Sequence, residues 1–169
     1  MTKSLANSEG LNHADRKFLS DIDRVGWHIT NILRRAGEED DGTPDWSFSC
    51  GLYSNFHHPE IVMFGLDSER RTDLINIIGH QVKDGKRFET SDNYGDIFER
   101  CLCAFRPVHQ SWYADYLGLA LWFYETYDFP VIQAFWPDKA DLYPWEVGCN
   151  SFVRGQQPLL FHPKAPTEE

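Results

Sequence analysis

Apolar residues recur at helical spacing in three stretches of the chain. Residues 13–24 carry apolar side chains on one face and predict a short amphipathic helix. Residues 67–84 carry a longer apolar stripe, which begins at Asp67, a residue type that caps helix N-termini, and ends before Gly85. Residues 111–127 are strongly aromatic and also follow the helical period. The second and third stretches are therefore the two main helices that the sequence predicts.

Shorter stretches alternate between apolar and polar residues or are apolar throughout, as β-strands are. Strands are predicted over residues 27–33, 46–53, 60–66, 99–108 and 129–136, with a short edge strand at residues 87–89. The brief connection between the second and third strands favours an antiparallel hairpin. Alternation in the fourth strand puts Cys101, Cys103 and Phe105 on one face. The last strand is apolar on both faces, which places it in the middle of the sheet.

Together these elements predict a single α+β domain, with a mostly antiparallel sheet of about five or six strands and two main helices. The 169 residues suffice for one hydrophobic core, and no linker or repeat divides them. The domain is expected over residues 13–162. The polar tails at residues 1–12 and 163–169 are expected to be disordered.

The net charge of the chain indicates which classes of binding partner are favoured. Asp and Glu outnumber Lys and Arg by 26 to 16, which gives a formal net charge of -10. Such a field repels phosphate backbones, so nucleic acid binding is disfavoured. A basic protein, such as a toxin, is a better electrostatic match. The alternative is that the charge serves solubility alone.

The same composition predicts a cytoplasmic protein. The first residues lack the apolar run of a secretory signal, and no stretch approaches the ~20 apolar residues that span a bilayer. Without a secretory signal, the four cysteines are expected to be reduced thiols buried in the core. Their spacing is not that of a zinc site, so no metal is predicted.

The cluster His57-His58-Pro59-Glu60 holds the best candidates for chemistry. If the strand has begun by His58, alternation puts His58 and Glu60 on one face, and an imidazole beside a carboxylate is the basic unit of general base catalysis. His58 and Glu60 are thus catalytic candidates, and His57 is a candidate for ligand binding. In the structural alternative, Pro59 sets the start of the strand and the two side chains cap the turn.

Trp136-Pro137-Asp138 is similar to the mobile acid loop of tyrosine phosphatases. That chemistry also needs a cysteine and an arginine around a phosphate-binding loop, and the pairs Cys101/Arg106 and Cys149/Arg154 are too close together and lack the intervening glycines. The phosphatase interpretation therefore fails. Asp138 stays a third catalytic candidate, and the alternative is that it starts a turn at the end of the strand.

Common catalytic signatures are missing from the chain. It contains no G-x-S-x-G elbow, no G-x-x-x-x-G-K-[ST] loop, no G-x-G-x-x-G turn and no H-E-x-x-H helix. Several frequent routes to hydrolase, nucleotidase, dehydrogenase and metalloprotease activity are therefore without local support.

An ordered set of motifs nevertheless resembles a bacterial family of domains of unknown function, family 4262. The motifs are GW, GLY, HPEIVMFGL, KDGKRFE, AFRPV, YLGLALWFY, FPVIQAFWPD and YPW, and the resemblance covers residues 22–160. It implies no established catalytic residues. The motif positions that it makes site candidates are His58, Pro59, Glu60, Gln133, Trp136, Asp138 and Trp145, of which Gln133, Trp136 and Trp145 are candidates for ligand binding. The acidic run at residues 38–41 departs from the family pattern.

Two classes of function stay open. The first is a cytosolic binding protein, for instance an immunity or antitoxin-type inhibitor that blocks a basic toxin through charge complementarity. The second is an enzyme or small-ligand-binding domain with a pocket built from His58, Glu60, Gln133, Trp136 and Asp138. The sequence predicts no cofactor, and it decides neither whether the protein is an enzyme nor its oligomeric state.

Overall fold

A computed structural model describes residues 2–7, 9–34, 37, 39 and 41–167. Its centre is a six-stranded sheet of order β1-β2-β3-β6-β5-β4. The strands are β1 (His28–Ile32), β2 (Trp46–Cys50), β3 (Glu60–Phe64), β4 (Asn93–Tyr94), β5 (Cys103–Pro107) and β6 (Val131–Phe135). The α-helices are α1 (His13–Arg24), α2 (Leu52–Phe56), α3 (Ser68–Lys83), α4 (Tyr113–Tyr116), α5 (Gly118–Tyr124) and α6 (Ser151–Gln156), and two 3-10 turns are η1 (Leu5–Asn7) and η2 (Gln110–Trp112).

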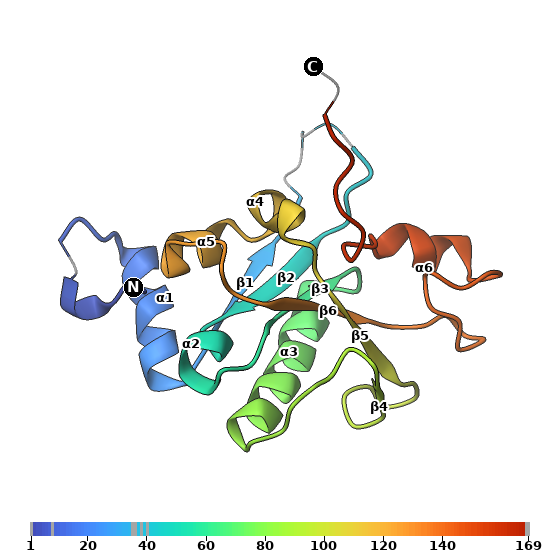
Figure 1. Ribbon diagram of the computed structural model, residues 1–169, viewed down its shortest axis with the longest axis horizontal. Helices are drawn as coiled ribbons and strands as arrows, with labels where there is room; N and C mark the ends of the chain where they lie inside the picture. Colours follow the sequence, from blue (N-terminus) through green and yellow to red (C-terminus); the bar gives the residue numbers. More distant parts are fainter. Residues whose placement is uncertain (1, 8, 35–36, 38, 40, 168–169) are drawn as a thin grey trace.

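The sheet is mixed but mostly antiparallel. Neighbouring strands pair antiparallel except β3 and β6, which run parallel at its centre with Glu60 opposite Val131. All residues of both central strands are buried. Figure 1 shows α3 beneath the sheet and α4 and α5 above it, while α6 extends beyond the end of β6. The fold is therefore a single α+β domain, as the sequence predicts.

Alternation along the central strands divides the core between the two faces of the sheet. Val62 belongs to a cluster with aromatic residues from α1 and α5, whereas its neighbour Ile61 packs with the buried residues of α3. A third, smaller cluster joins Phe135 to Tyr143, with Trp145 packed against it. This last cluster anchors the loop that follows β6.

Most of the predicted elements are confirmed. The helix at residues 13–24 has the predicted bounds, and a capping box from Asn12 starts it. The side chain of Asp67 accepts a hydrogen bond of 2.8 Å from the backbone N–H of Arg70 and caps α3, as predicted. The antiparallel β2–β3 hairpin, the shared core face of Cys103 and Phe105, and the central place of β6 are also confirmed.

Four local predictions are wrong, and two short helices, α2 and α6, were not predicted. The predicted strand at residues 46–53 ends at Cys50, because Gly51 takes a left-handed φ of 115° and is the N-cap of α2. Residues 87–89 form no strand; the edge strand is β4, further along the chain. The predicted strand at residues 99–108 begins only at Cys103. The predicted helix at residues 111–127 is divided into η2, α4 and α5, with a break at Leu117.

The disorder expected at the two ends stays a prediction. In the structure, the backbone N–H of Lys3 donates a 3.0 Å hydrogen bond to the carbonyl of Phe123, and Leu5 and Leu11 pack against the core. Among the described residues, no helix combines the length and apolar character that crossing a bilayer requires.

A close approach between α3 and β1 fixes the position of α3 on the sheet. Gly79 faces the indole of Trp27, and a Cβ atom at Gly79 would lie 2.6 Å from Trp27 Cε2. The indole is buried, and its Nε1–H donates a 3.0 Å hydrogen bond to Asn76 Oδ1 one turn earlier on α3. Only glycine therefore leaves room for the ring.

Gly79→Ala is expected to lower the free energy of unfolding by up to about 2 kcal/mol, because overpacking costs about 1–3 kcal/mol and better helix propensity returns only about 1. Gly155→Ala in α6 is the matched control, since a Cβ there meets no atom within 4 Å. We expect that control to unfold at equal or higher denaturant concentration. Equal effects of the two substitutions in urea denaturation would contradict the packing argument.

Candidate functional site

Glu60 is the most buried carboxylate of the predicted site. It begins β3, its exposed fraction is 0%, and its two oxygens accept four hydrogen bonds. Oε1 accepts from the backbone N–H of Gly51 at 2.7 Å, from that of Tyr53 at 3.2 Å and from the Tyr124 hydroxyl at 2.5 Å, and Oε2 accepts from the Ser49 hydroxyl at 2.6 Å. These partners come from β2, α2 and α5, so the carboxylate joins three elements of the fold.

Burial and hydrogen bonding act on this carboxyl group in opposite directions. Burial raises the pKa of Glu60, whereas the hydrogen bonds from Ser49, Tyr124 and the two backbone N–H groups favour the charged form; the net pKa lies above its usual value. Burial and the neighbouring Glu60 also raise the pKa of Tyr124, which keeps its hydroxyl protonated as a donor. The hydrogen bonds from the backbone N–H groups of Gly51 and Tyr53 cap the start of α2. They therefore secure α2 to the sheet.

The side chain of His58 contacts different residues from that of Glu60. Because β3 begins only at Glu60, the alternation that would place both side chains on one face does not reach His58. The imidazole is fully buried and packs edge-on against Phe88. Its Nδ1 lies 2.8 Å from the Pro59 carbonyl, and Nε2 accepts a 3.1 Å hydrogen bond from the backbone N–H of Phe88. Burial lowers the pKa of His58, so the ring is neutral with its proton on Nδ1.

Asp138 organises the loop after β6. Oδ1 accepts from the backbone N–H of Ala140 and Leu142, and Oδ2 accepts from the backbone N–H of Asn150 at 2.8 Å. These hydrogen bonds, of which that from Asn150 has the largest effect, lower the pKa of Asp138 below its usual value. The geometry matches the turn that the sequence offers as the alternative to catalysis.

The remaining sequence candidates are spread over the molecule. His57 is exposed and ends α2 in a left-handed conformation with φ of 54°. Gln133 donates from Nε2 to the Pro158 carbonyl at 2.8 Å, and its buried Oε1 has no partner within the described part of the chain. Trp136 donates from Nε1 to the Phe64 carbonyl at 3.0 Å. The structure therefore does not gather His58, Glu60, Gln133, Trp136 and Asp138 around one cavity.

Trp145, the last candidate, borders a pocket of about 630 Å³ between the loop after β4 and the loop after β6. Its indole stacks on Tyr143 with 5.1 Å between ring centroids and meets Phe135 edge-on. The Tyr143 hydroxyl donates a 2.6 Å hydrogen bond to the Leu102 carbonyl, which ties the two loops together. The lining residues are Asn93, Gly95, Phe98, Glu99, Arg100, Cys101, Leu102, Arg106, Asp141, Tyr143, Trp145 and Glu146.

Arg106 is the half-buried cation of this pocket. Its guanidinium carbon lies 4.3 Å from the centre of the Trp145 ring, within cation–π distance. Nη1 donates to the carbonyls of Phe105 at 2.8 Å and Thr90 at 3.1 Å. No carboxylate among the described residues forms an ion pair with Arg106. Its position is thus fixed by neutral groups, and its charge is not neutralised by the protein.

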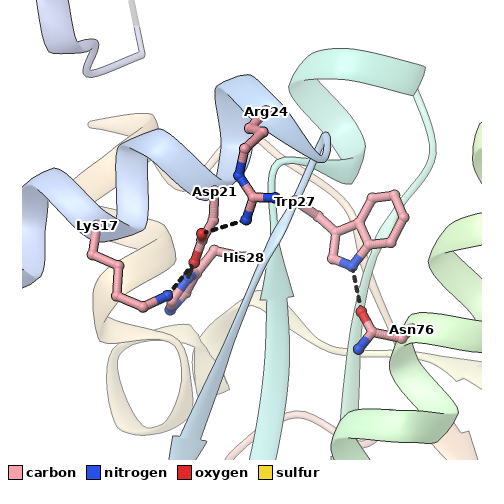
Figure 2. Close-up of polar contacts among 6 residues, drawn as sticks. All are labelled: Lys17, Asp21, Arg24, Trp27, His28 and Asn76. Atoms are coloured by element: carbon pink, nitrogen blue, oxygen red, sulfur yellow. Dashed lines mark hydrogen bonds and ion pairs between the residues drawn. The ribbon is translucent and has the colours of Figure 1, made fainter.

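A second polar cluster lies where α1 meets β1 (Figure 2). Asp21 accepts hydrogen bonds from Lys17 Nζ at 2.8 Å and Arg24 Nη2 at 3.4 Å, and its Oδ2 lies 2.8 Å from His28 Nδ1. Partial burial on its own raises the pKa of Asp21, but the hydrogen bonds from Lys17 and His28 and their charges outweigh it, so the pKa is lowered. The cluster ties the end of α1 to β1 and borders a hollow of about 300 Å³.

Metal-binding chemistry has little support in the geometry. Within the described ranges, no three His, Cys, Asp or Glu side chains are grouped as metal ligands. Cys50, Cys103 and Cys149 are buried and Cys101 is half-buried, and burial raises the pKa of each thiol. The thiols are therefore protonated near neutral pH.

Sequence reasoning missed Arg106, Tyr143 and the Asp21–His28 pair. A signal for Arg106 was present, because a charged residue stands between apolar neighbours inside the predicted strand at residues 99–108. Tyr143 reaches the pocket through a loop, and Asp21 meets His28 across a helix end. Neither contact can be predicted from the helical or strand periodicity of the sequence.

The fold and the pocket define a small α+β domain with a surface cavity, a class that hosts many unrelated activities. The chain belongs to the family described as Domain of unknown function (DUF4262), whose model matches residues 21–150. The resemblance inferred from the motifs is thus confirmed over most of its length. No curated protein and no solved structure matches the chain.

Glu60→Gln keeps the side-chain volume but turns one acceptor oxygen into a donor. We expect it to lower the free energy of unfolding by about 1–3 kcal/mol, because a buried donor then lacks its acceptor. Glu89→Gln, at an exposed position, is the control and should be neutral. Urea denaturation of both variants measures the difference. A neutral Glu60→Gln would show that the four hydrogen bonds do not hold the fold.

Asp21→Asn removes a carboxylate whose pKa is lowered in the folded protein. Such a group stabilises the fold above its unfolded pKa, and this contribution is lost as the pH falls through the folded value. The variant is therefore expected to be less stable by about 1–2 kcal/mol near neutral pH, with the difference vanishing in acid. Exposed Asp23→Asn, on the same helix, is the control. A difference that persists unchanged well below the usual aspartate pKa would contradict this linkage.

Proposed function

We propose that the domain is a binding protein and that the pocket of Arg106 and Trp145 binds a small molecule. The observation that carries the proposal is the half-buried guanidinium of Arg106, which is held in place by backbone carbonyls and an indole and has no carboxylate partner among the described residues. A cation that is held in place inside a cavity and makes no ion pair can act as a recognition group for a ligand.

The size and lining of the pocket support this assignment. Its volume of about 630 Å³ lies within the range of about 300–1,000 Å³ that is usual for small-molecule sites. Phe98, Leu102, Tyr143 and Trp145 supply apolar surface, and charged side chains supply orientation. Trp145, a ligand-binding candidate from the sequence, is the candidate that borders this cavity.

The contacts of the other candidates favour binding over catalysis. Glu60, His58 and Asp138 direct their polar atoms mainly at backbone groups and at the side chains of Ser49 and Tyr124. Each therefore has a structural task that accounts for its presence. None of these three residues lines the pocket of Arg106.

A fragment screen followed by NMR tests the pocket. We expect hits to shift the indole N–H resonance of Trp145, which a Trp145→Phe spectrum assigns. Arg106→Gln should weaken the binding of hits that carry a carboxylate, because it removes the fixed cation. Lys139→Gln makes the same change of charge at an exposed residue outside this pocket and should leave binding intact. Hits that shift other resonances but leave the indole N–H resonance of Trp145 unchanged would overturn the assignment.

A basic protein, such as a toxin inhibited by this chain, is a second candidate ligand. The net charge of -10 supports it, as do two solvent-exposed apolar side chains near the C-terminal end, Val147 at 97% and Phe152 at 69% exposure. Aromatic side chains such as that of Phe152 are enriched at protein interfaces.

This candidate predicts a salt-sensitive complex. A basic protein recovered with the tagged domain, then identified and purified, should bind with an affinity that falls as salt rises. Phe152→Ser should weaken the purified pair, whereas Tyr127→Ser, which changes another exposed ring, should not. Binding that is unaffected by both salt and Phe152→Ser would rule this interface out.

A further inference from the structure

Charges of both signs line the pocket of Arg106 without neutralising one another. The carboxylates are those of Glu99, Asp141 and Glu146, and the guanidinium groups are those of Arg100 and Arg106. None of these five side chains forms an ion pair with a described residue. Opposite charges that share one cavity and stay unpaired leave both signs available to a ligand.

Some of these charged side chains are held in place by contacts, and others are exposed. Arg106 is fixed by the Phe105 and Thr90 carbonyls and by Trp145, and Glu146 is fixed by a 2.8 Å hydrogen bond from the backbone N–H of Tyr143. Glu99 and Asp141 are exposed. The fixed guanidinium thus lines the same cavity as two free carboxylates.

Ligands with a single charge suit this lining poorly. An anion paired with Arg106 would be repelled by three carboxylates, and a cation paired with the carboxylates would face an immobile guanidinium in a partly buried setting. A molecule with both charges meets a partner for each. The apolar part of such a molecule would lie against Phe98 and Leu102.

We propose that the pocket binds a zwitterion the size of an amino acid or a short peptide. Its carboxylate pairs with Arg106, and its ammonium group pairs with Glu99 and Asp141. This assignment of the ligand class rests on the proposed function of the pocket.

The test uses the common α-amino acids and a set of dipeptides, each beside its C-terminal amide and its N-acetyl derivative. Binding is followed by the indole N–H resonance of Trp145. The free zwitterion is expected to bind about tenfold or more tightly than either capped form, because each cap removes one charge-assisted contact. Thermal unfolding of every variant verifies that it is folded.

The variants assign each charge to its partner. Arg106→Gln should erase the preference for a free carboxylate over the amide but keep the preference for a free ammonium. The double variant Glu99→Gln/Asp141→Asn should do the reverse, and Lys139→Gln should retain both preferences. Capped forms that bind as tightly as the zwitterion would overturn the ligand class while leaving the pocket in place. If no compound, including the fragments of the screen, shifts the indole N–H resonance of Trp145, both proposals are overturned.

Discussion

The buried carboxylate of Glu60 is the contact on which the centre of this domain depends. It occupies the first position of a central strand and binds the end of β2, the start of α2 and the hydroxyl of Tyr124 on α5. A charged or acidic group without these donors would be costly in the core, and the donors without the carboxylate would be buried and unpaired. The carboxylate and its donors therefore satisfy one another, and together they hold the β2–β3 connection on the sheet.

The position of the pocket follows from the rigid centre through β5 and β6. Phe135 ends β6 in the core and contacts Trp145, and Asp138 closes the following loop with hydrogen bonds from three backbone N–H groups. Arg106 stands on β5 opposite Gln133 of β6, so the sheet itself places the guanidinium. The cavity is thus bordered by a strand residue and by two loops that hydrogen bonds hold in place, an arrangement that keeps the cavity preformed.

The sequence predicted the features that local rules govern. Helical spacing and an Asp cap located α3, and an apolar run located β6 at the centre of the sheet. It did not predict α2, because the left-handed turn at Gly51 is stabilised by Glu60, a tertiary contact that no period reveals. For the same reason it grouped His58 with Glu60: alternation applies only inside a strand, and β3 begins at Glu60. Among the ligand-binding candidates, Trp145 does border the pocket, but its partner Arg106 comes from a separate segment.

Native-state hydrogen exchange at the backbone amides of Gly51 and Tyr53 tests the central role of Glu60 most directly. Both amides donate to its carboxylate, one of them at 2.7 Å. If this contact closes the core, both amides exchange only through global unfolding, with the same free energy as the amides of β3 and β6. Exchange through a local opening, at a free energy far below that of the central strands, would show that the carboxylate does not hold this connection.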